Sequence, residues 1–193
     1  MNSDILLVFF YSYLLGSIPF GLILTKIFLK QDIRKIGSGN IGTTNVLRTG
    51  KKSLAIATLI LDILKGYSSV IISLIYFSDL FIFSALICFI AHIFPIWLKF
   101  KGGKGVAVYV GIILAISLPL GILFAASWLL IAFFFKYSSL SSIIGALIVL
   151  ICSIILKKFL ISLFLFISFT IILFTHRENI RKLKNSEESK IKL

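Results

Sequence analysis

Glycines and small polar residues are concentrated in the segment 36–52, which reads IGSGNIGTTNVLRTGKK. Glycine backbone can adopt positive φ and direct its N–H groups at an anion, while hydroxyl, amide and guanidinium groups add further donors. A flexible, solvated connecting loop is the alternative interpretation. Because the segment has many donors and no acidic residue, we favour an anion site, with positive φ expected at Gly37, Gly39 and Gly42. The side-chain donors are Ser38, Asn40, Thr43, Thr44, Asn45 and Arg48.

A second group of glycines and lysines follows in the segment 91–108, AHIFPIWLKFKGGKGVAV. Its members are Lys101, Gly102, Gly103, Lys104 and Gly105. This is not a Walker A loop, because the glycine spacing differs and Gly105 stands where that loop has the Ser or Thr that binds magnesium. A helix is expected directly afterwards, and its N-terminus would attract an anion. A basic hinge would explain Lys99 and Lys101 but not three glycines, so we predict a second anion site.

A third polar segment, FTHRENIRKLK (174–184), follows the last apolar run. His176 and Asn179 would share one face if the helix continues, with Arg177 beside them. Basic residues after a final membrane helix usually mark its cytoplasmic end, but that explanation does not account for a histidine and an asparagine at the membrane boundary. We therefore keep His176, Arg177 and Asn179 as candidates. For His92, in the second segment, a structural role is favoured.

Asp62 and Lys65 are three residues apart inside an apolar run. Charges within a membrane are costly and need partners. A structural ion pair is the favoured interpretation, although either side chain could still reach the site.

The composition identifies an integral membrane protein. Of 193 residues, 59% are hydrophobic, against roughly 45 to 50% in a soluble domain, and the mean hydropathy is +1.10. The net charge of +13 comes mostly from Lys and Arg at the ends of apolar runs. It therefore indicates topology signals and contact with anionic lipid, not nucleic acid. The spacing of Cys88 and Cys152 indicates neither a disulfide framework nor a metal site.

Apolar runs of spanning length predict a bundle of about seven transmembrane helices. Their expected ranges are 5–29, 53–77, 80–98, 106–118, 120–135, 139–156 and 159–175. The first contains Gly16, Ser17, Pro19 and Gly21, which predict a kink or a close helix contact. The fourth and fifth are short and are treated as a hairpin, because Pro119 would break a continuous helix. A five-helix arrangement that merges or excludes them is the alternative.

Basic loops predict the orientation of the helices. The segments 30–52 and 99–104 are basic and the turn at Ser78 and Asp79 is not, so the N-terminus is expected outside and the C-terminus in the cytoplasm. All three polar segments would then emerge on the cytoplasmic face. Lys157 and Lys158 fall on the outer side against this rule, unless the sixth segment is re-entrant or shallow. The chain 1–193 is expected to form a single domain with a frayed polar tail over 182–193.

Three motifs in order resemble those of the bacterial acyl-phosphate glycerol-3-phosphate acyltransferases. They are SGNIGTTNVLR (38–48), AHIFPIWLKFKGGKGVAV (91–108) and HRENI (176–180), and LDILKG (61–66) is also similar. The likeness covers nearly the whole chain. Thr43 and Ala91 depart from the family's usual Ala and Gly, and neither change removes an expected donor.

The resemblance implies transfer of a fatty acyl group from acyl phosphate to the 1-hydroxyl of sn-glycerol 3-phosphate, giving lysophosphatidic acid and inorganic phosphate. It implies no cofactor or metal, a bacterial cytoplasmic (inner) membrane, and the soluble enzyme that makes acyl phosphate as a candidate partner. By the same resemblance, Ser38, Arg48, Lys104, His176 and Asn179 serve glycerol 3-phosphate and the reaction centre. Acyl phosphate would be held by Thr44, Asn45 and the 102–105 backbone, with Asn40, Gly42, Lys101 and Arg177 as further binding residues.

A carrier or flippase for an anionic metabolite or lipid is the alternative function. Glycines and cations at helix ends also suit a transporter. Transporters, however, usually bind near the midplane and show paired repeats, whereas here the polar segments are all expected at one rim. The enzyme is therefore favoured.

Overall fold

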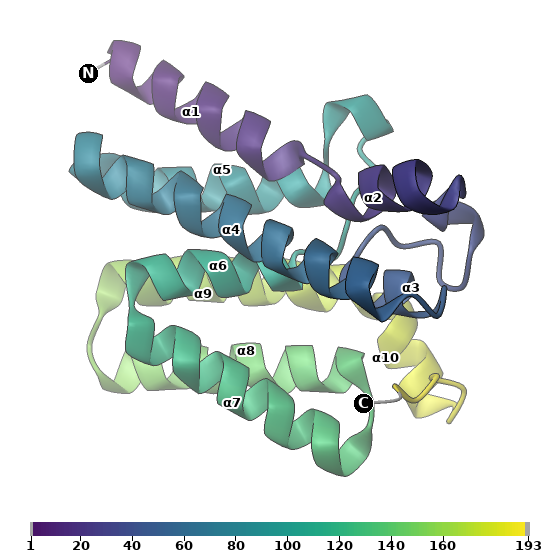
Figure 1. Ribbon diagram of the computed structural model, residues 1–193. Coiled ribbons are helices and arrows are strands. Elements are labelled where there is room, and N and C mark those ends of the chain that lie inside the picture. Colours follow the sequence, from purple (N-terminus) through teal and green to yellow (C-terminus); the bar gives the residue numbers. More distant parts are fainter. Residues whose placement is uncertain (1, 192–193) are drawn as a thin grey trace. The chain divides into compact units, whose positions relative to one another are not determined.

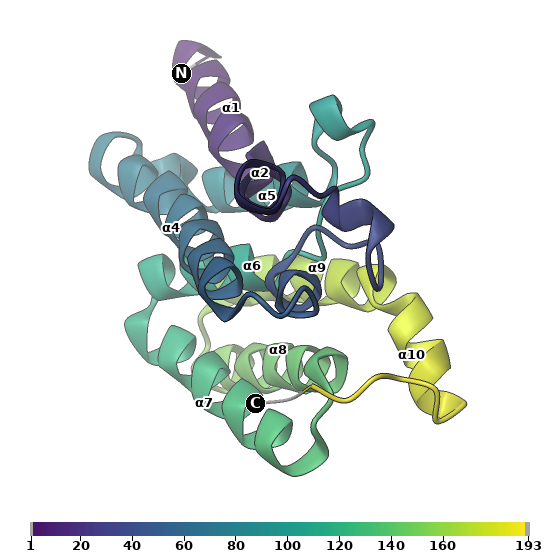
Figure 2. The same cartoon turned by 45° about the vertical axis from the view of Figure 1, so that its right-hand side comes forward.

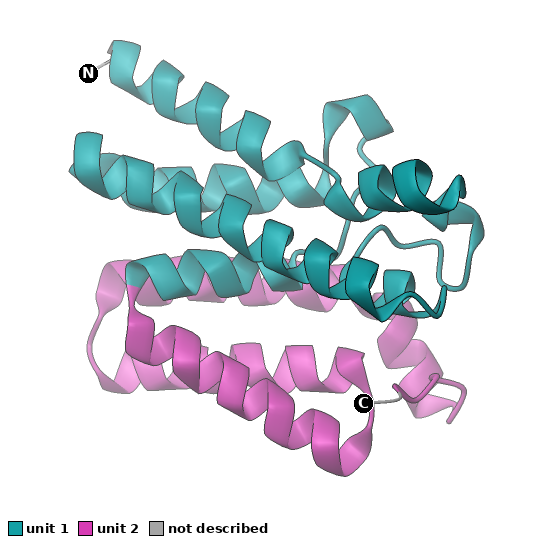
Figure 3. Cartoon of the chain, viewed as in Figure 1, with its two compact units in different colours: residues 1–116 teal, residues 117–193 magenta. Residues whose placement is uncertain are grey.

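The computed structural model describes residues 2–191, and within that range the chain is helical with connecting loops and no β-strand, as the sequence predicts. Backbone contacts divide the chain into two compact units, Met1–Ile116 and Ser117–Leu193 (Figure 3). The helices of unit 1 are α1 (Asn2–Ser17), α2 (Phe20–Leu29), α3 (Thr43–Leu47), α4 (Lys52–Tyr76), α5 (Phe81–Ile93) and α6 (Val106–Ile116). Those of unit 2 are α7 (Leu118–Phe135), α8 (Ser138–Ile155), α9 (Phe159–Thr175) and α10 (Arg177–Lys184).

The first apolar run is interrupted at Pro19. It was expected as one kinked helix over 5–29, and it forms α1 and α2 with a break at Ile18 and Pro19. Proline has no N–H to donate and its ring clashes with the preceding turn, so the helix cannot continue through it. The break leaves the carbonyl of Ile18 available to a side chain from another helix, the ammonium of Lys65.

Helix α4 is the centre of unit 1, in contact with α1, α2, α3, α5 and α6 (Figure 1). Its approach to α6 depends on small residues, because a Cβ on Gly111 would lie 2.8 Å from the carbonyl carbon of Ile63 and 2.9 Å from the nitrogen of Tyr67. Buried serines link α4 and α5, with Ser69 Oγ 3.0 Å from Ser84 Oγ. Close packing and side-chain hydrogen bonds of this kind replace the hydrophobic effect inside a membrane.

Helices α5 and α6 are short, with 13 and 11 residues against 25 in α4. A Cβ on Gly66, in the middle of α4, would lie 3.1 Å from Val108 in the first turn of α6, so α6 begins beside the middle of α4 and not at its end. The α-helix expected over 80–98 ends at Ile93. A 3-10 turn at Ile96–Leu98 follows, with Ile96 and Trp97 exposed, and the chain is buried again at Gly103 and Gly105. Irregular backbone is tolerated at this depth where protein surrounds it. The prediction that the second polar segment lies at the rim is therefore wrong for its last residues.

Unit 2 consists of the α7–α8 hairpin and α9. Two short helices divided at Pro119 were expected over 106–135. The structure has α6 with 11 residues and α7 with 18, and Pro119 lies in the first turn of α7 and not between the helices. A proline is accommodated there because the first N–H groups of a helix have no partner in any case. Helix α9 has the expected bounds. Hydrogen bonds between Trp128 and Ser142 and between Ser153 and Ser162 join successive helices.

The polar tail is folded onto unit 2. Helix α10 leaves α9 at an angle of 60° and extends to Lys184, and the following segment returns toward α8 (Figure 2). The N–H of Ile191 donates to the carbonyl of Lys136 at 2.8 Å, and Ser139 donates to Glu188 at 2.9 Å. The tail was expected to be frayed over 182–193. Its described residues, up to 191, make these hydrogen bonds, and 192–193 lie outside the described range. Polar composition alone did not reveal these contacts.

Five helical segments are long and apolar enough to cross a membrane, and α9 with α10 makes a sixth if the bent pair counts as one span. The five are Ser3–Leu29, Lys52–Tyr76, Ser78–Leu98, Leu118–Phe135 and Ser138–Ile155. Helix α6 is a shorter apolar helix.

Candidate functional site

Asn45 organises the first polar segment. Its side chain is buried, and its Nδ2 lies within hydrogen-bond distance of three carbonyl oxygens, those of Ile33 at 3.1 Å, Ile36 at 2.9 Å and Asn40 at 2.8 Å. Its Oδ1 accepts from the N–H of Ser38 at 3.0 Å. The amide of Asn45 is thus engaged by the loop itself. It was expected to hold substrate, and the contacts that the structure shows for this amide are with the loop.

An apolar cluster lies beneath this loop and explains why it is ordered. The buried members come from α2, the loop, α3 and α4, and are Leu22, Ile33, Ile41, Val46 and Ala55. Leu98, which follows α5, packs against the same cluster. The cluster therefore connects the first polar segment with the chain that leads to the second, and the interpretation as a flexible solvated loop is wrong.

Arg48 and Ser38 are brought together by Gly37. Gly37 has φ of 56°, and a Cβ there would lie 2.9 Å from Cδ of Arg48 and 3.2 Å from its Nη1. The arginine side chain therefore crosses directly over the glycine that precedes Ser38. Gly39 also has positive φ, as expected, but Gly42 has φ of −82°. Gly42 is instead the N-cap of α3, and its N–H donates to Oδ1 of Asn40 at 2.8 Å.

Of the two threonines at the start of α3, Thr43 has a buried hydroxyl without a hydrogen-bond partner in the described structure. It is one of the two departures from the family motifs, and its hydroxyl has no visible use. Thr44 is half-buried in the same turn.

Before the loop, Asp32 accepts hydrogen bonds from Arg34, and this guanidinium holds the pKa of the Asp32 carboxyl well below its ordinary value. The loop therefore begins with a neutralised charge pair.

The glycines of the second segment allow this loop to pack closely against the end of α5, and two of them do not offer their N–H groups to an anion. The N–H of Gly102 donates to Ile93 at 2.9 Å, and the N–H of Gly103 donates to His92 at 3.0 Å. These two N–H groups satisfy carbonyls at the end of α5 and do not point at an anion, contrary to the expected role of the 102–105 backbone. Only Gly105 of the three has positive φ, 88°. The donors that remain are the first N–H groups of α6, which have no partner within the helix.

The lysines of this segment differ in exposure. Lys99 and Lys101 are exposed, whereas Lys104 is half-buried between Gly103 and Gly105, which are both buried. Lys104 is therefore the lysine held closest to the N-terminus of α6. Exposed lysines at a membrane boundary need no further role, so the geometry favours Lys104 over Lys101 as a substrate ligand.

Gly103→Ala is expected to lower activity strongly while the protein still inserts. A Cβ at this position would lie 2.8 Å from Cε1 of His92, and that ring is buried and cannot easily move. The loop must shift, and a misplacement of about 1 Å can cost roughly 100-fold in rate. Ser73→Ala is the control, because the Ser73 hydroxyl donates locally to the carbonyl of Phe77 at the far end of α4. Equal activity of the two variants in a steady-state assay would contradict the prediction.

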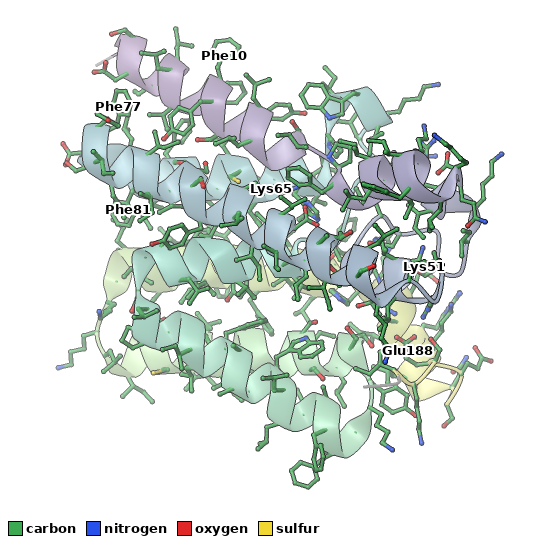
Figure 4. All side chains as sticks on the ribbon, viewed as in Figure 1. Phe10, Lys51, Lys65, Phe77, Phe81 and Glu188 are labelled. Atoms are coloured by element: carbon green, nitrogen blue, oxygen red, sulfur yellow. The ribbon has the colours of Figure 1, made fainter. Side chains whose placement is uncertain are left out.

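Lys65 lies in the middle of α4 (Figure 4). Its Nζ is 2.8 Å from Asp62 Oδ1, which is the expected ion pair. Both side chains are buried. Lys65 Nζ also lies 2.9 Å from Nδ1 of His92 and donates to the carbonyl of Ile18 at 2.6 Å. The structural interpretation of His92 agrees with these contacts. The sequence did not reveal that the three side chains meet.

The third polar segment lies in unit 2, at the bend between α9 and α10. His176 is buried, and its Nδ1 lies 2.9 Å from the carbonyl of Ile172, which can only accept. The Nδ1 therefore carries the proton and Nε2 has the lone pair. Asn179 donates to Glu188 at 2.7 Å. The Arg177 guanidinium turns back onto Phe174, 4.5 Å from the ring centroid.

Within unit 1 the structure thus brings together the first two candidate segments, through Leu98 and the apolar cluster. The sequence analysis assigned Asn45 to substrate and favoured a structural role for His92, and the structure shows both side chains in contact with the polar segments. The isoleucines and valine spaced through the polar loop were the available signal for the first, because they predict a packed loop. No signal in the sequence places His92 next to Lys65.

Comparison with known proteins is consistent with this fold. The sequence profile of the glycerol-3-phosphate acyltransferase family matches residues 6–186. A glycerol-3-phosphate acyltransferase of Pelagibacter ubique is 54% identical over 190 residues, covering 98% of this chain and 99% of the relative. Crystal structures of PlsY (YgiH), an integral membrane glycerol 3-phosphate acyltransferase, in its glycerol 3-phosphate and lysophosphatidic acid forms are 31% identical and match with TM-scores of 0.93 and 0.90. In both comparisons the alignment covers 98% of this chain and 96% of the solved one. The chain is therefore an integral membrane protein that belongs to the glycerol-3-phosphate acyltransferase family.

Proposed function

We propose that the chain transfers a fatty acyl group from acyl phosphate to the 1-hydroxyl of sn-glycerol 3-phosphate. The observation that carries this proposal is the half-buried Lys104 at the N-terminus of α6, in the same unit as the loop that holds Ser38 and Arg48. Two neighbouring groups of cations and N–H donors suit two substrates that each carry a phosphate. The solved structures of PlsY support this assignment, because one is its glycerol 3-phosphate form and the other its lysophosphatidic acid form.

The reaction needs orientation and charge neutralisation more than a strong base. Acyl phosphate is a mixed anhydride with a good leaving group. The hydroxyl oxygen forms the new ester bond to the acyl carbon, and the bond from that carbon to the phosphate oxygen breaks, so that inorganic phosphate leaves. The hydroxyl proton passes to His176 or to a phosphate oxygen of a substrate. Positively charged groups and oriented N–H donors stabilise the developing oxyanion and the departing phosphate.

The contacts refine the roles proposed for individual residues. Arg48, with Ser38 beside it, binds the phosphate of glycerol 3-phosphate, and Lys104 with the first N–H groups of α6 neutralises charge at the reacting acyl phosphate. Thr44, Asn40, Gly42 and Lys101 remain binding candidates, while Asn45, Gly102 and Gly103 position the backbone. His176 and Asn179 take part in the same reaction. The lone pair on Nε2 of His176 suits it to orient or deprotonate the attacking hydroxyl, and Arg177 is kept as an accessory residue.

We also propose seven spans, with the N-terminus outside and the C-terminus in the cytoplasm. The spans are α1 with α2, α4, α5, α6, α7, α8 and α9. At one end of unit 1 lie Lys51 and the basic loop, and at the other lies Phe77 (Figure 4). This separation supports an orientation with the basic end inside.

The whole chain acts as one acyltransferase domain in the bacterial cytoplasmic membrane, with its active site facing the cytoplasm. A soluble enzyme that makes acyl phosphate supplies the donor. Acyl phosphate has a polar head and an apolar chain, so it can reach the site from the bilayer after delivery at the cytoplasmic surface. The other substrate, glycerol 3-phosphate, enters from water on the same side.

The test is product formation by the purified protein in lipid, with labelled glycerol 3-phosphate and either palmitoyl phosphate or palmitoyl-CoA as donor, in the presence of EDTA. Labelled lysophosphatidic acid is expected from the acyl phosphate alone. Product from palmitoyl-CoA alone would contradict the proposed donor. No product from either donor, with folded protein, would overturn the proposed function and favour transport of an anionic metabolite.

A further inference from the structure

The buried charges of α4, Asp62 and Lys65, have no part in the proposed chemistry. Lys65 nevertheless contacts His92, against which the second polar segment packs. Lys65 is 4% exposed and Asp62 2%. An ion pair in the interior costs desolvation energy and is not by itself a source of stability. Stability alone therefore does not explain why this ion pair is buried in contact with Ile18 and His92.

Lys65 determines the tautomer of His92. Its ammonium group lies within hydrogen-bond distance of Ile18 O at 2.6 Å and His92 Nδ1 at 2.9 Å. Asp62 Oδ1, at 2.8 Å, is its ion-pair partner. Lys65 is paired with the carboxylate of Asp62, and as an ammonium it can only donate. Nδ1 of His92 must therefore accept, and the proton of the neutral imidazole lies on Nε2. His176 has the opposite arrangement, with Nδ1 donating to a carbonyl.

His92 in turn holds the second glycine segment by two contacts. Its main-chain carbonyl accepts from the N–H of Gly103 at 3.0 Å. Its ring lies where a side chain on Gly103 would be, so the loop rests directly on the imidazole. The next residue along the chain is Lys104. A change in the position of the His92 ring is therefore passed to Lys104 through one residue.

We propose that Lys65, with Asp62 as its counter-ion, is a positioning residue for the acyltransferase site. It fixes the Nε2-protonated form and the orientation of His92, and His92 holds Gly102–Gly103 so that Lys104 stays at the N-terminus of α6. The expected effect of Lys65 on catalysis rests on the proposed function of Lys104. The expected effect of Lys65 on the His92 tautomer and on the position of the loop is independent of that function.

The first measurement is the ¹⁵N spectrum of the ring nitrogens in protein labelled at histidine and held in lipid nanodiscs. The chain has two histidines, so His176→Gln assigns the His92 signals by difference. Protonation of Nε2 and not Nδ1 is expected at His92, and the reverse at His176. A His92 with its proton on Nδ1 would overturn the proposal.

The second measurement uses the double variant Asp62→Asn with Lys65→Met, which removes both charges and leaves no buried charge unpaired. We expect loss of the single tautomer at His92, faster hydrogen exchange at Gly102 and Gly103, and a kcat about 10- to 100-fold lower. Ser73→Ala is the control, a buried polar residue on the same helix that bonds locally to Phe77. It should change none of the three readouts.

The outcomes separate this inference from the proposed function. Unchanged exchange and kcat in the double variant would overturn the positioning role. If the wild-type protein makes no product while the tautomer and the loop exchange respond as expected, the proposed reaction fails and the hold of Lys65 on the loop stands.

Discussion

Lys104→Ala is expected to lower kcat about 100- to 1,000-fold, the usual cost of removing one group that stabilises charge in the transition state. Lys104 is half-buried beside the first N–H groups of α6. There its charge is less screened than at the exposed Lys99 and Lys101, and it adds to the partial charge of the helix N-terminus. Steady-state kinetics with acyl phosphate and glycerol 3-phosphate, in nanodiscs of fixed lipid composition, would measure the change.

Lys99→Ala is the matched control for this variant. It removes the same charge from the same segment, five residues earlier, and from an exposed side chain. Its main-chain φ of 52° is a cost that lysine and alanine bear alike, so the comparison isolates the charge. The control should retain nearly full activity. If both variants lost activity equally, the segment would act through its overall positive charge, and the placement of Lys104 would have no special role.

The positions of the helices could be predicted well wherever polar residues mark both ends of an apolar run. Helix α9 begins and ends as expected, and α4 differs by one residue at each end. The prediction of regular α-helix failed between Ile93 and Leu98, where an exposed 3-10 turn follows α5, because an apolar turn has the same hydropathy as an apolar helix. Pro95 was the available signal for an earlier end of α5, since a helix usually stops before a proline.

In the candidate site, the residue types were predicted more reliably than their roles. Glycines were expected to supply free N–H donors, but Gly103 is needed because a ring lies against it and Gly42 because it caps α3. The reason is general. A sequence shows where a side chain is missing, whereas the use of the space depends on residues such as His92 that another helix brings there.

Asn45→Ala is expected to disorder the first polar segment and to lower kcat/KM by about 100-fold or more. The change removes one acceptor and the two N–H donors that serve three carbonyls. A buried polar group left without a partner costs about 1–3 kcal/mol, so the loop is expected to open locally. Ser38 and Arg48 then lose their common position over Gly37, and orientation is the main requirement of the reaction.

Asn45→Asp distinguishes this explanation from a direct contact with substrate. Aspartate keeps the size of the side chain and the acceptor for Ser38, but as a carboxylate it cannot donate to the three carbonyls. If Asn45 positions the loop, both variants should speed hydrogen exchange over residues 37–45 and lower activity together, while Thr49→Ala, whose hydroxyl bonds locally to Val46, should do neither. Lost activity with unchanged exchange would instead show that Asn45 acts on the substrate, as the family motif alone suggested. The two measurements together therefore decide whether the loop or the ligand is the partner of this amide.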